Sequence, residues 1–158
     1  MIFVDFKTKI NGTSDVKEHD KWIEFDSYAF NASRSIQGHG TAMTTSHAHV
    51  SELMLTKQGD ITSPELFAQA VTGATLQEAN IVVKRPQGAG GALKTVVHIT
   101  LTNPVVSSFS SQCGANGVPT EHISLSYEKI KFEYTGFDST KQQAKPVKTY
   151  DLSKREMV

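Results

Sequence analysis

One short helix between two strand-like segments constrains the fold of this chain more than any other feature. The segment from residue 51 to residue 85 reads as strand, helix and strand. Ser63 is the predicted N-cap, and Pro64 takes the first helical position, where its missing N–H costs nothing. Gly73 is predicted to end the helix, because glycine adopts the left-handed C′ conformation without strain. So short a helix is not stable alone in water and must pack on a sheet.

The rest of the sequence supplies that sheet. The helix would face it with an apolar stripe of Leu66, Phe67, Ala70 and Val71. Strand-like patterns occupy residues 2–10, 22–31, 47–57, 78–84, 94–108, 120–135 and 147–152. We therefore predict a mainly β fold in a single domain, residues 1–158: a small, partly closed antiparallel β-barrel of about seven or eight strands, with one short helix packed outside.

The strand over residues 22–31 carries large apolar groups on both faces. Ile23, Phe25 and Ala29 are predicted to point one way. The other face would carry Trp22, Tyr28 and Phe30. A strand with two apolar faces needs cover on both sides. We expect the barrel interior to cover one face and a helix or a neighbouring subunit the other, which makes the second trio candidate subunit-interface residues.

Four other segments are predicted from their turn residues or their phase. Residues 33–46 are small, polar and without period, which predicts a long functional loop. Residues 86–91 are predicted to form a hairpin connection. Pro104 marks an edge or a bulge, because it cannot donate to a ladder. The phase of the strand over residues 120–135 changes near Glu128–Lys129, which we interpret as a bulge.

Charge and apolar patterning exclude several classes of protein. The 16 basic and 16 acidic residues balance, whereas nucleic-acid-binding proteins normally carry a basic excess. The sequence has no apolar run long enough for a transmembrane helix, and its N-terminus lacks the pattern of a secretory signal. A single cysteine, Cys113, excludes an internal disulfide and fits a reducing cytoplasm.

No group of residues has the pattern of an active site, a metal site or a cofactor site. His47 and His49 share one strand face, but no further ligand type lies at metal-binding spacing. The glycine-rich residues 88–91 precede a strand rather than a helix, so they favour a hairpin over a phosphate loop. Cys113 has no activating neighbour in sequence. His98 and His122 are predicted to be surface groups on a sheet.

Several stretches, taken in order, resemble the Hcp family, the tube protein of the bacterial type VI secretion system. Each is mostly strand pattern, but their order and spacing over about 130 residues are specific. The matching stretches are Lys21–Phe30, Leu53–Lys57, Asp60, Ser63–Leu66, Ala79–Arg85, Leu101–Ser108, Pro119–Glu121, Leu125–Tyr127 and Ile130–Tyr134.

The resemblance implies a structural protein rather than an enzyme. Family members form hexameric rings that stack into a tube, which a contractile sheath expels behind a VgrG spike. The channel carries secreted effectors, and no cofactor is involved. The protein would be made in the bacterial cytoplasm and exported through the apparatus. Residues 33–46 resemble the loop that joins successive rings, with Ser35, Gln37, His39, Thr41, Met43 and Thr44 as its candidate stacking residues.

Three alternatives remain open from the sequence. A β-barrel that binds a small ligand in its mouth would be a stable monomer with an internal cavity. A related injection-tube protein, such as that of a phage tail, would share the fold. An enzyme would have to use Cys113 or the pair His47 and His49.

Overall fold

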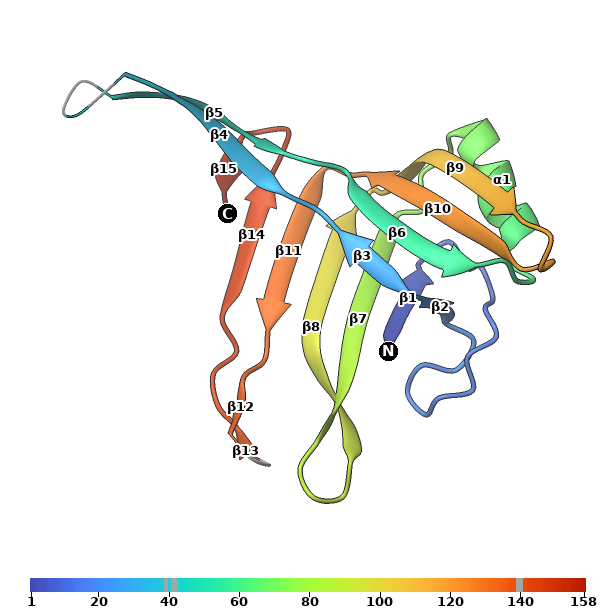
Figure 1. Cartoon of the computed structure of the whole chain (residues 1–158). Coiled ribbons are helices and arrows are strands. Elements are labelled where there is room, and N and C mark those ends of the chain that lie inside the picture. The colour runs from blue at the N-terminus through green and yellow to red at the C-terminus, as the bar shows by residue number, and fades with distance from the viewer. Residues whose placement is uncertain (39, 41–42, 139–140) are drawn as a thin grey trace.

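Two antiparallel sheets, packed face to face, make up the body of the computed structural model (Figure 1), which describes residues 1–38, 40, 43–138 and 141–158. The larger sheet has the strand order β15-β14-β11-β8-β7-β1-β2. Its strands are β1 (Ile2–Phe6), β2 (Ile23–Phe25), β7 (Glu78–Gln87), β8 (Ala92–Thr102), β11 (Lys129–Tyr134), β14 (Val147–Asp151) and β15 (Glu156–Met157).

The smaller sheet has the order β3-β6-β10-β9. Its strands are β3 (Ser27–Ala29), β6 (Leu53–Gln58), β9 (Val105–Cys113) and β10 (Pro119–Ser126). Two separate hairpins complete the strands: β4 (Ala32–Gln37) with β5 (Thr44–Val50), and β12 (Phe137–Asp138) with β13 (Lys141–Gln142). The predicted hairpin at residues 86–91 is confirmed between β7 and β8, with its turn at residues 88–91.

The hydrophobic core lies between the two sheets. The larger sheet contributes Val4, Ile81, Ile99 and Leu101, and the smaller sheet contributes Leu53, Leu55, Ile123 and Leu125. All are almost fully buried. Along β7 the inward Ala79 and Ile81 alternate with the outward Glu78 and Asn80. The outer face also carries Val82, which is buried beside its partner Phe3 of β1.

The chain passes from one sheet to the other at three corners, where the sequence predicts continuous strands. The segment 22–31 divides at Asp26, the segment 94–108 at Asn103–Pro104 and the segment 120–135 at Tyr127–Glu128. The predicted bulge near Lys129 is therefore wrong, because the change of phase marks a change of sheet. The corners give a barrel-like outline, although no ladder closes the two sheets into one barrel among the described residues.

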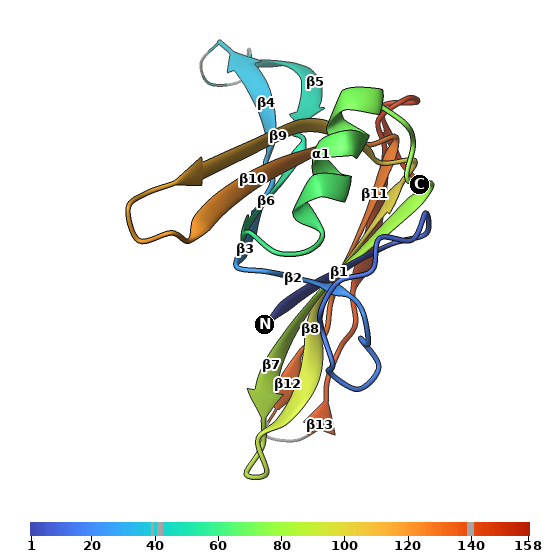
Figure 2. The ribbon, with the colours of Figure 1, turned by 90° about the vertical axis from the view of Figure 1, so that its right-hand side faces the viewer.

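The predicted helix is α1 (Ser63–Thr72), which packs along β9 (Figure 2). Gly73 ends it at φ 66°, as predicted, and its N–H donates to Gln69 O at 2.9 Å. The N-cap is Thr62 rather than Ser63, whose hydroxyl instead accepts from the N–H of Asp60. Leu66 is buried in the core, but Phe67 and Val71 from the predicted stripe are more than half exposed. That stripe is thus wider than the face that packs.

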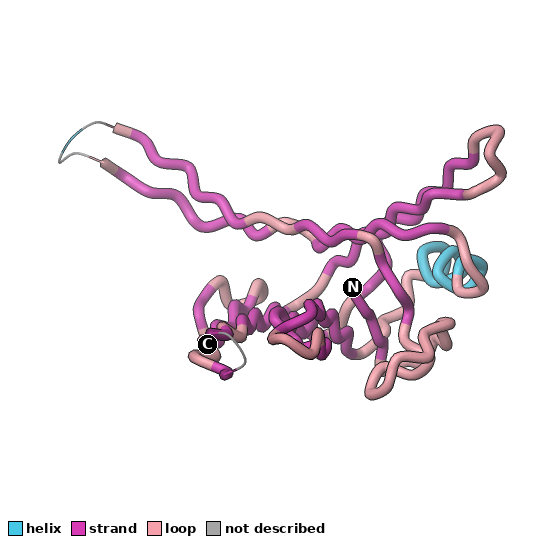
Figure 3. Tube along the Cα trace, turned by 60° about the horizontal axis from the view of Figure 1, so that its bottom comes forward, coloured by secondary structure: helices cyan, strands magenta, loops and turns pink. Residues whose placement is uncertain are grey.

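The predicted loop over residues 33–46 is wrong, because most of it forms the β4–β5 hairpin. This hairpin, the arm, extends beyond both sheets (Figures 1 and 3). Every residue of β4 is exposed, so neither face needs apolar groups and no alternation appears in the sequence. The predicted strand over residues 47–57 likewise divides, since Ser51 and Glu52 separate the arm from β6.

Candidate assembly surfaces

The smaller sheet has two open edges. Among the described residues, β3 pairs only with β6. β9 pairs with β10 along its length and, apart from one bridge between its first residue Val105 and Thr75, with no other segment of the described chain. An unpaired edge presents a row of backbone donors and acceptors that another chain can extend. The same sheet therefore offers two different edges for pairing, one at each side.

Hydrogen bonding shows which backbone groups of β9 face its open edge. The N–H of Gly59 donates to Pro119 O at 3.0 Å, so the backbone of Pro119 faces β6. Pro119 is the cross-strand partner of Cys113. Because the backbone of Pro119 faces β6, Pro119 and Cys113 form a non-hydrogen-bonded antiparallel pair, in which both residues direct their N–H and C=O groups away from each other. Cys113 and, two residues earlier, Ser111 thus present their N–H and C=O groups at the open edge.

The face of the smaller sheet that points away from the core is uncharged. It alternates with the buried residues of each strand and is mostly exposed. Its residues are Ser27, Ala29, Met54, Thr56, Gln58, Ser108, Ser110, Gln112, Thr120, His122, Ser124 and Ser126. With histidine neutral, these strand residues offer hydroxyl and amide groups and no formal charge. The carboxylate of Glu52, which precedes β6, lies at the border of this face and accepts from Ser107 Oγ at 2.9 Å.

The arm carries four of the six predicted stacking residues within the described chain. Ser35 and Gln37 lie on β4, Thr44 opens β5 and Met43 immediately precedes it. His39 and Thr41 lie outside the described residues. The Ser46 hydroxyl fixes the register of the arm, accepting from the N–H of Ser35 at 3.1 Å. Sequence reasoning missed Ile36, whose side chain is 60% exposed, as is that of Met43.

The structure does not bring the three predicted subunit-interface residues together. Trp22 lies on the outer face of the larger sheet, with its ring 4.5 Å from that of His19. Tyr28 and Phe30 are half-buried at the edge of the core, and Phe30 lies 5.7 Å from Phe132. Ala29 is exposed rather than sharing the buried face of Ile23 and Phe25. The role of Trp22, Tyr28 and Phe30 in an interface stays a prediction.

A second exposed apolar group lies on and just before α1. Ile61, Phe67 and Val71 are 71%, 56% and 70% exposed. Phe67 also lies 6.1 Å from Phe109 of β9, which anchors this group beside the open edge. The sequence shows Phe67 and Val71 one helical turn apart and predicts that both face the sheet, whereas both are more than half exposed.

The candidate chemical groups stay separate in space. His47 and His49 are exposed on β5, and no cluster of three or more metal-ligating side chains occurs in the described ranges. Cys113 is exposed at the end of β9. His122 is exposed, as predicted, and lies 3.2 Å from the Thr56 hydroxyl. His98 is instead half-buried, with hydrogen-bond partners on both ring nitrogens.

Comparison with known proteins decides the family. The model of the family described as "Type VI secretion system effector, Hcp" matches residues 3–134. The chain belongs to the Hcp family. The resemblance predicted from the sequence is thereby confirmed. None of the curated protein sequences compared with the chain matches it.

Solved Hcp structures share the fold over the whole chain. A type six secretion system protein superposes with a TM-score of 0.90 at 23% identity, covering 99% of this chain and 98% of the other. Hcp1 from Salmonella typhimurium gives 0.77 at 22% identity, covering 99% and 97%. The tube-terminating cap of the anti-feeding prophage gives 0.51 at 13% identity, covering 84% and 87%.

These findings support a tube-subunit role in type VI secretion and the predicted mainly β fold. Hcp is a family of secreted structural tube proteins rather than a family of enzymes. In the part of the chain that the structure describes, no helix is long and apolar enough to span a membrane.

Proposed function

We propose that six copies of this protein close into a ring through the open edges of the smaller sheet, and that rings stack into the secretion tube. The observation that carries this is the presence of two different open edges, β3 and β9, on one sheet. Pairing β9 of one subunit with β3 of the next is a heterologous contact, which generates a ring when its rotation closes.

Strand direction supports this pairing. Every neighbouring pair in the sheet β3-β6-β10-β9 is antiparallel, so β3 and β9 run in opposite directions. Rotation about a ring axis that runs along the strands leaves their direction unchanged. β9 therefore meets β3 of the next copy in the antiparallel sense, and the ladder continues around the ring without a break.

In such a ring the uncharged outer face of the smaller sheet lines the channel. The core and the larger sheet lie behind it, so the twelve outward residues named above form the wall. Serine, threonine and glutamine side chains offer hydrogen bonds to folded cargo without selecting for its charge. This wall suits a channel that carries and protects varied secreted effectors, which is the cargo role proposed here.

The remaining surfaces suit contacts along and around the tube. The arm extends beyond both sheets and exposes Ile36 and Met43, which supports a contact with a neighbouring ring. The apolar group Ile61, Phe67 and Val71 lies on the helix side. The tube is proposed to contact a VgrG-like spike and a contractile sheath. The protein is proposed to leave the bacterial cytoplasm by this route and to act without enzymatic activity, cofactor, nucleic acid or membrane insertion.

Solution mass and one edge variant test the ring. One chain has a mass of 17.3 kDa, so a hexamer has about 104 kDa. Proline at Ser111 removes only an N–H that faces the open edge, which an edge strand tolerates. Ser111→Pro should give a folded monomer in light scattering, whereas the control Ser111→Ala should stay hexameric. A folded Ser111→Pro hexamer, or a dilution-stable wild-type monomer, would overturn edge pairing.

A further inference from the structure

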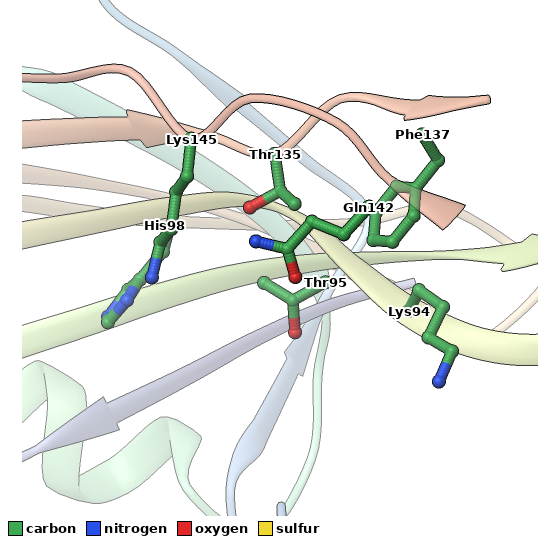
Figure 4. Close-up of a pocket in the computed structure, with 7 residues that line it drawn as sticks. All are labelled: Lys94, Thr95, His98, Thr135, Phe137, Gln142 and Lys145. Atoms are coloured by element: carbon green, nitrogen blue, oxygen red, sulfur yellow. The ribbon is translucent and has the colours of Figure 1, made fainter. Parts of the chain in front are cut away.

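A cationic pocket lies on the outer face of the larger sheet, away from the surfaces assigned to assembly. It has a volume of about 440 Å³ and opens between β8 and the β12–β13 hairpin (Figure 4). The pocket is lined by Lys94, Thr95, His98, Thr135, Phe137, Gln142 and Lys145. Small-molecule sites in proteins are typically about 300–1,000 Å³, so this volume admits a small organic ligand.

Polar groups from three segments line this pocket. Thr95 comes from β8, Thr135 follows β11 and Gln142 belongs to β13. Figure 4 shows the Thr135 hydroxyl and the Gln142 amide directed into the same space, whereas the Thr95 hydroxyl and the Lys94 ammonium group point away from them. The ring of Phe137 provides an apolar wall beside them. The lining thus combines hydrogen-bond donors with one flat apolar surface.

The charge of the lining is positive. Lys94 and Lys145 contribute two ammonium groups, and neither has an ion-pair partner among the described residues. No carboxylate lines the pocket. The nearby carboxylate of Glu133 is engaged, because it lies 3.0 Å from His98 Nδ1. An uncompensated positive pocket in a chain of zero net charge is a local feature that favours an anion.

We propose that this pocket binds the phosphate group of a small phosphorylated molecule. The Lys145 ammonium group would bind the phosphate as a point charge, and the Thr135 hydroxyl and the Gln142 amide would supply the hydrogen bonds that fix it. The volume left over and the Phe137 ring accommodate an organic group on the phosphate. Such a site adds a ligand to a protein whose family role is structural.

The pKa of His98 should change when a ligand occupies the pocket. Its Nδ1 faces Glu133 on β11, and its Nε2 lies 2.9 Å from Asn80 Oδ1 on β7. Burial lowers the pKa of His98, Glu133 opposes that shift, and the charges of Lys131 and Lys145 lower the pKa further. A phosphate beside Lys145 offsets its charge, so binding should raise the pKa of His98.

Titration with AMP tests the site, with the His98 ring followed by NMR and heat followed by calorimetry. Binding should be saturable and should move the His98 titration to higher pH. Lys145→Gln should weaken binding about tenfold or more, because it removes a charge-assisted contact. Lys148→Gln is the matched control: Lys148 is the partner of Phe132, on the other face of the sheet, and its loss should leave binding unchanged.

Two further ligands identify the group that is recognised. If inorganic phosphate binds at the same site, a free phosphate is sufficient for binding. If AMP binds more tightly than phosphate, the organic part of AMP adds to the affinity. Either result supports the proposal. Adenosine should not compete. Non-saturable binding, equal weakening by both glutamine variants, or adenosine binding as tight as AMP would each overturn the phosphate site.

Discussion

The ammonium group of Lys57 lies 2.9 Å from the carboxylate of Glu121, its direct cross-strand partner on β10. Both side chains are almost fully buried. The same ammonium lies 2.8 Å from Asp60 Oδ1 and donates to Gln58 O, just before α1 begins. One buried cation thus ties β6, β10 and the start of the helix together.

Replacing Lys57 with methionine should strongly destabilise the fold. The variant leaves Glu121 and Asp60 without their cation, and breaking a buried pair in this way costs about 3–5 kcal/mol. Urea unfolding measures the loss. The control Lys9→Met removes a surface pair with Asp5 and should cost less than about 1 kcal/mol. Equal losses for the two variants would contradict the structural role of Lys57.

Protonation of Asp60 at low pH should lower the free energy of unfolding. Burial disfavours its charged form, but hydrogen bonds from Lys57 and Thr62 outweigh burial and hold the pKa of Asp60 below its ordinary 3.8. A carboxyl with a lowered pKa stabilises the fold above its unfolded pKa and loses that contribution as pH falls through the folded value. Asp60→Asn should therefore flatten the fall in unfolding free energy below about pH 4; an unchanged slope would contradict this.

Ionisation of Tyr127 at high pH should also lower the free energy of unfolding, in this case as the pH rises. The Tyr127 hydroxyl donates to Ser51 O at 2.7 Å, which joins the corner at Tyr127 to the segment between the arm and β6. Burial, with the charge of Glu52, raises the pKa of Tyr127 to about 12. The stabilisation is full below about pH 10 and is lost as pH rises towards 12. Tyr127→Phe should cost about 1 kcal/mol at neutral pH and reduce the alkaline loss. The control Tyr134→Phe changes an exposed side chain and should cost less at neutral pH.

Gly12 should resist substitution for a steric reason. A Cβ atom there would lie 2.2 Å from Trp22 O, and the Gly12 N–H donates to Lys21 O at 2.8 Å. Gly12→Ala should cost about 1–3 kcal/mol through overpacking and change the fluorescence of Trp22, the single tryptophan. Gly90→Ala, with nothing within 4 Å of its added carbon, is the control. If Gly12→Ala changed neither the free energy of unfolding nor the Trp22 fluorescence, the close approach of Gly12 to the backbone of Trp22 would be contradicted.

The sequence predicted best where the signal was local. Pro64 and Gly73 located the helix, because each acts through its own backbone conformation. The corner at Asp26 was not predicted because large apolar residues continue on both sides of it. The change of phase near Tyr127–Glu128 is visible in the sequence but predicts a bulge, because phase does not record which sheet a strand joins. Asn103–Pro104 also carries a local signal, the proline, which predicts an edge or a bulge rather than a corner.

The assembly surfaces were harder to predict for a different reason. The arm has no apolar face against its own chain, so its strands leave no periodic pattern. Tyr28 and Phe30 are apolar enough for an interface, yet they pack at the edge of their own core. The open edges of β3 and β9 depend on strand order, which a single sequence does not specify.

Shortening the arm should separate ring formation from tube growth. Deleting Gln37–Thr44 removes the tip of a hairpin that lies outside the core, so the fold and the edges β3 and β9 stay intact. We expect a hexamer of unchanged mass that forms no tubes in electron micrographs and is not secreted. Ile36→Ser should weaken stacking in the same direction, because its exposed apolar side chain is lost without shortening the arm. Val147→Ser, which removes an exposed apolar side chain on β14, outside the surfaces assigned to assembly, is the control that should still form tubes. Loss of the hexamer would place the arm within the ring, and unaltered secretion would exclude it from stacking.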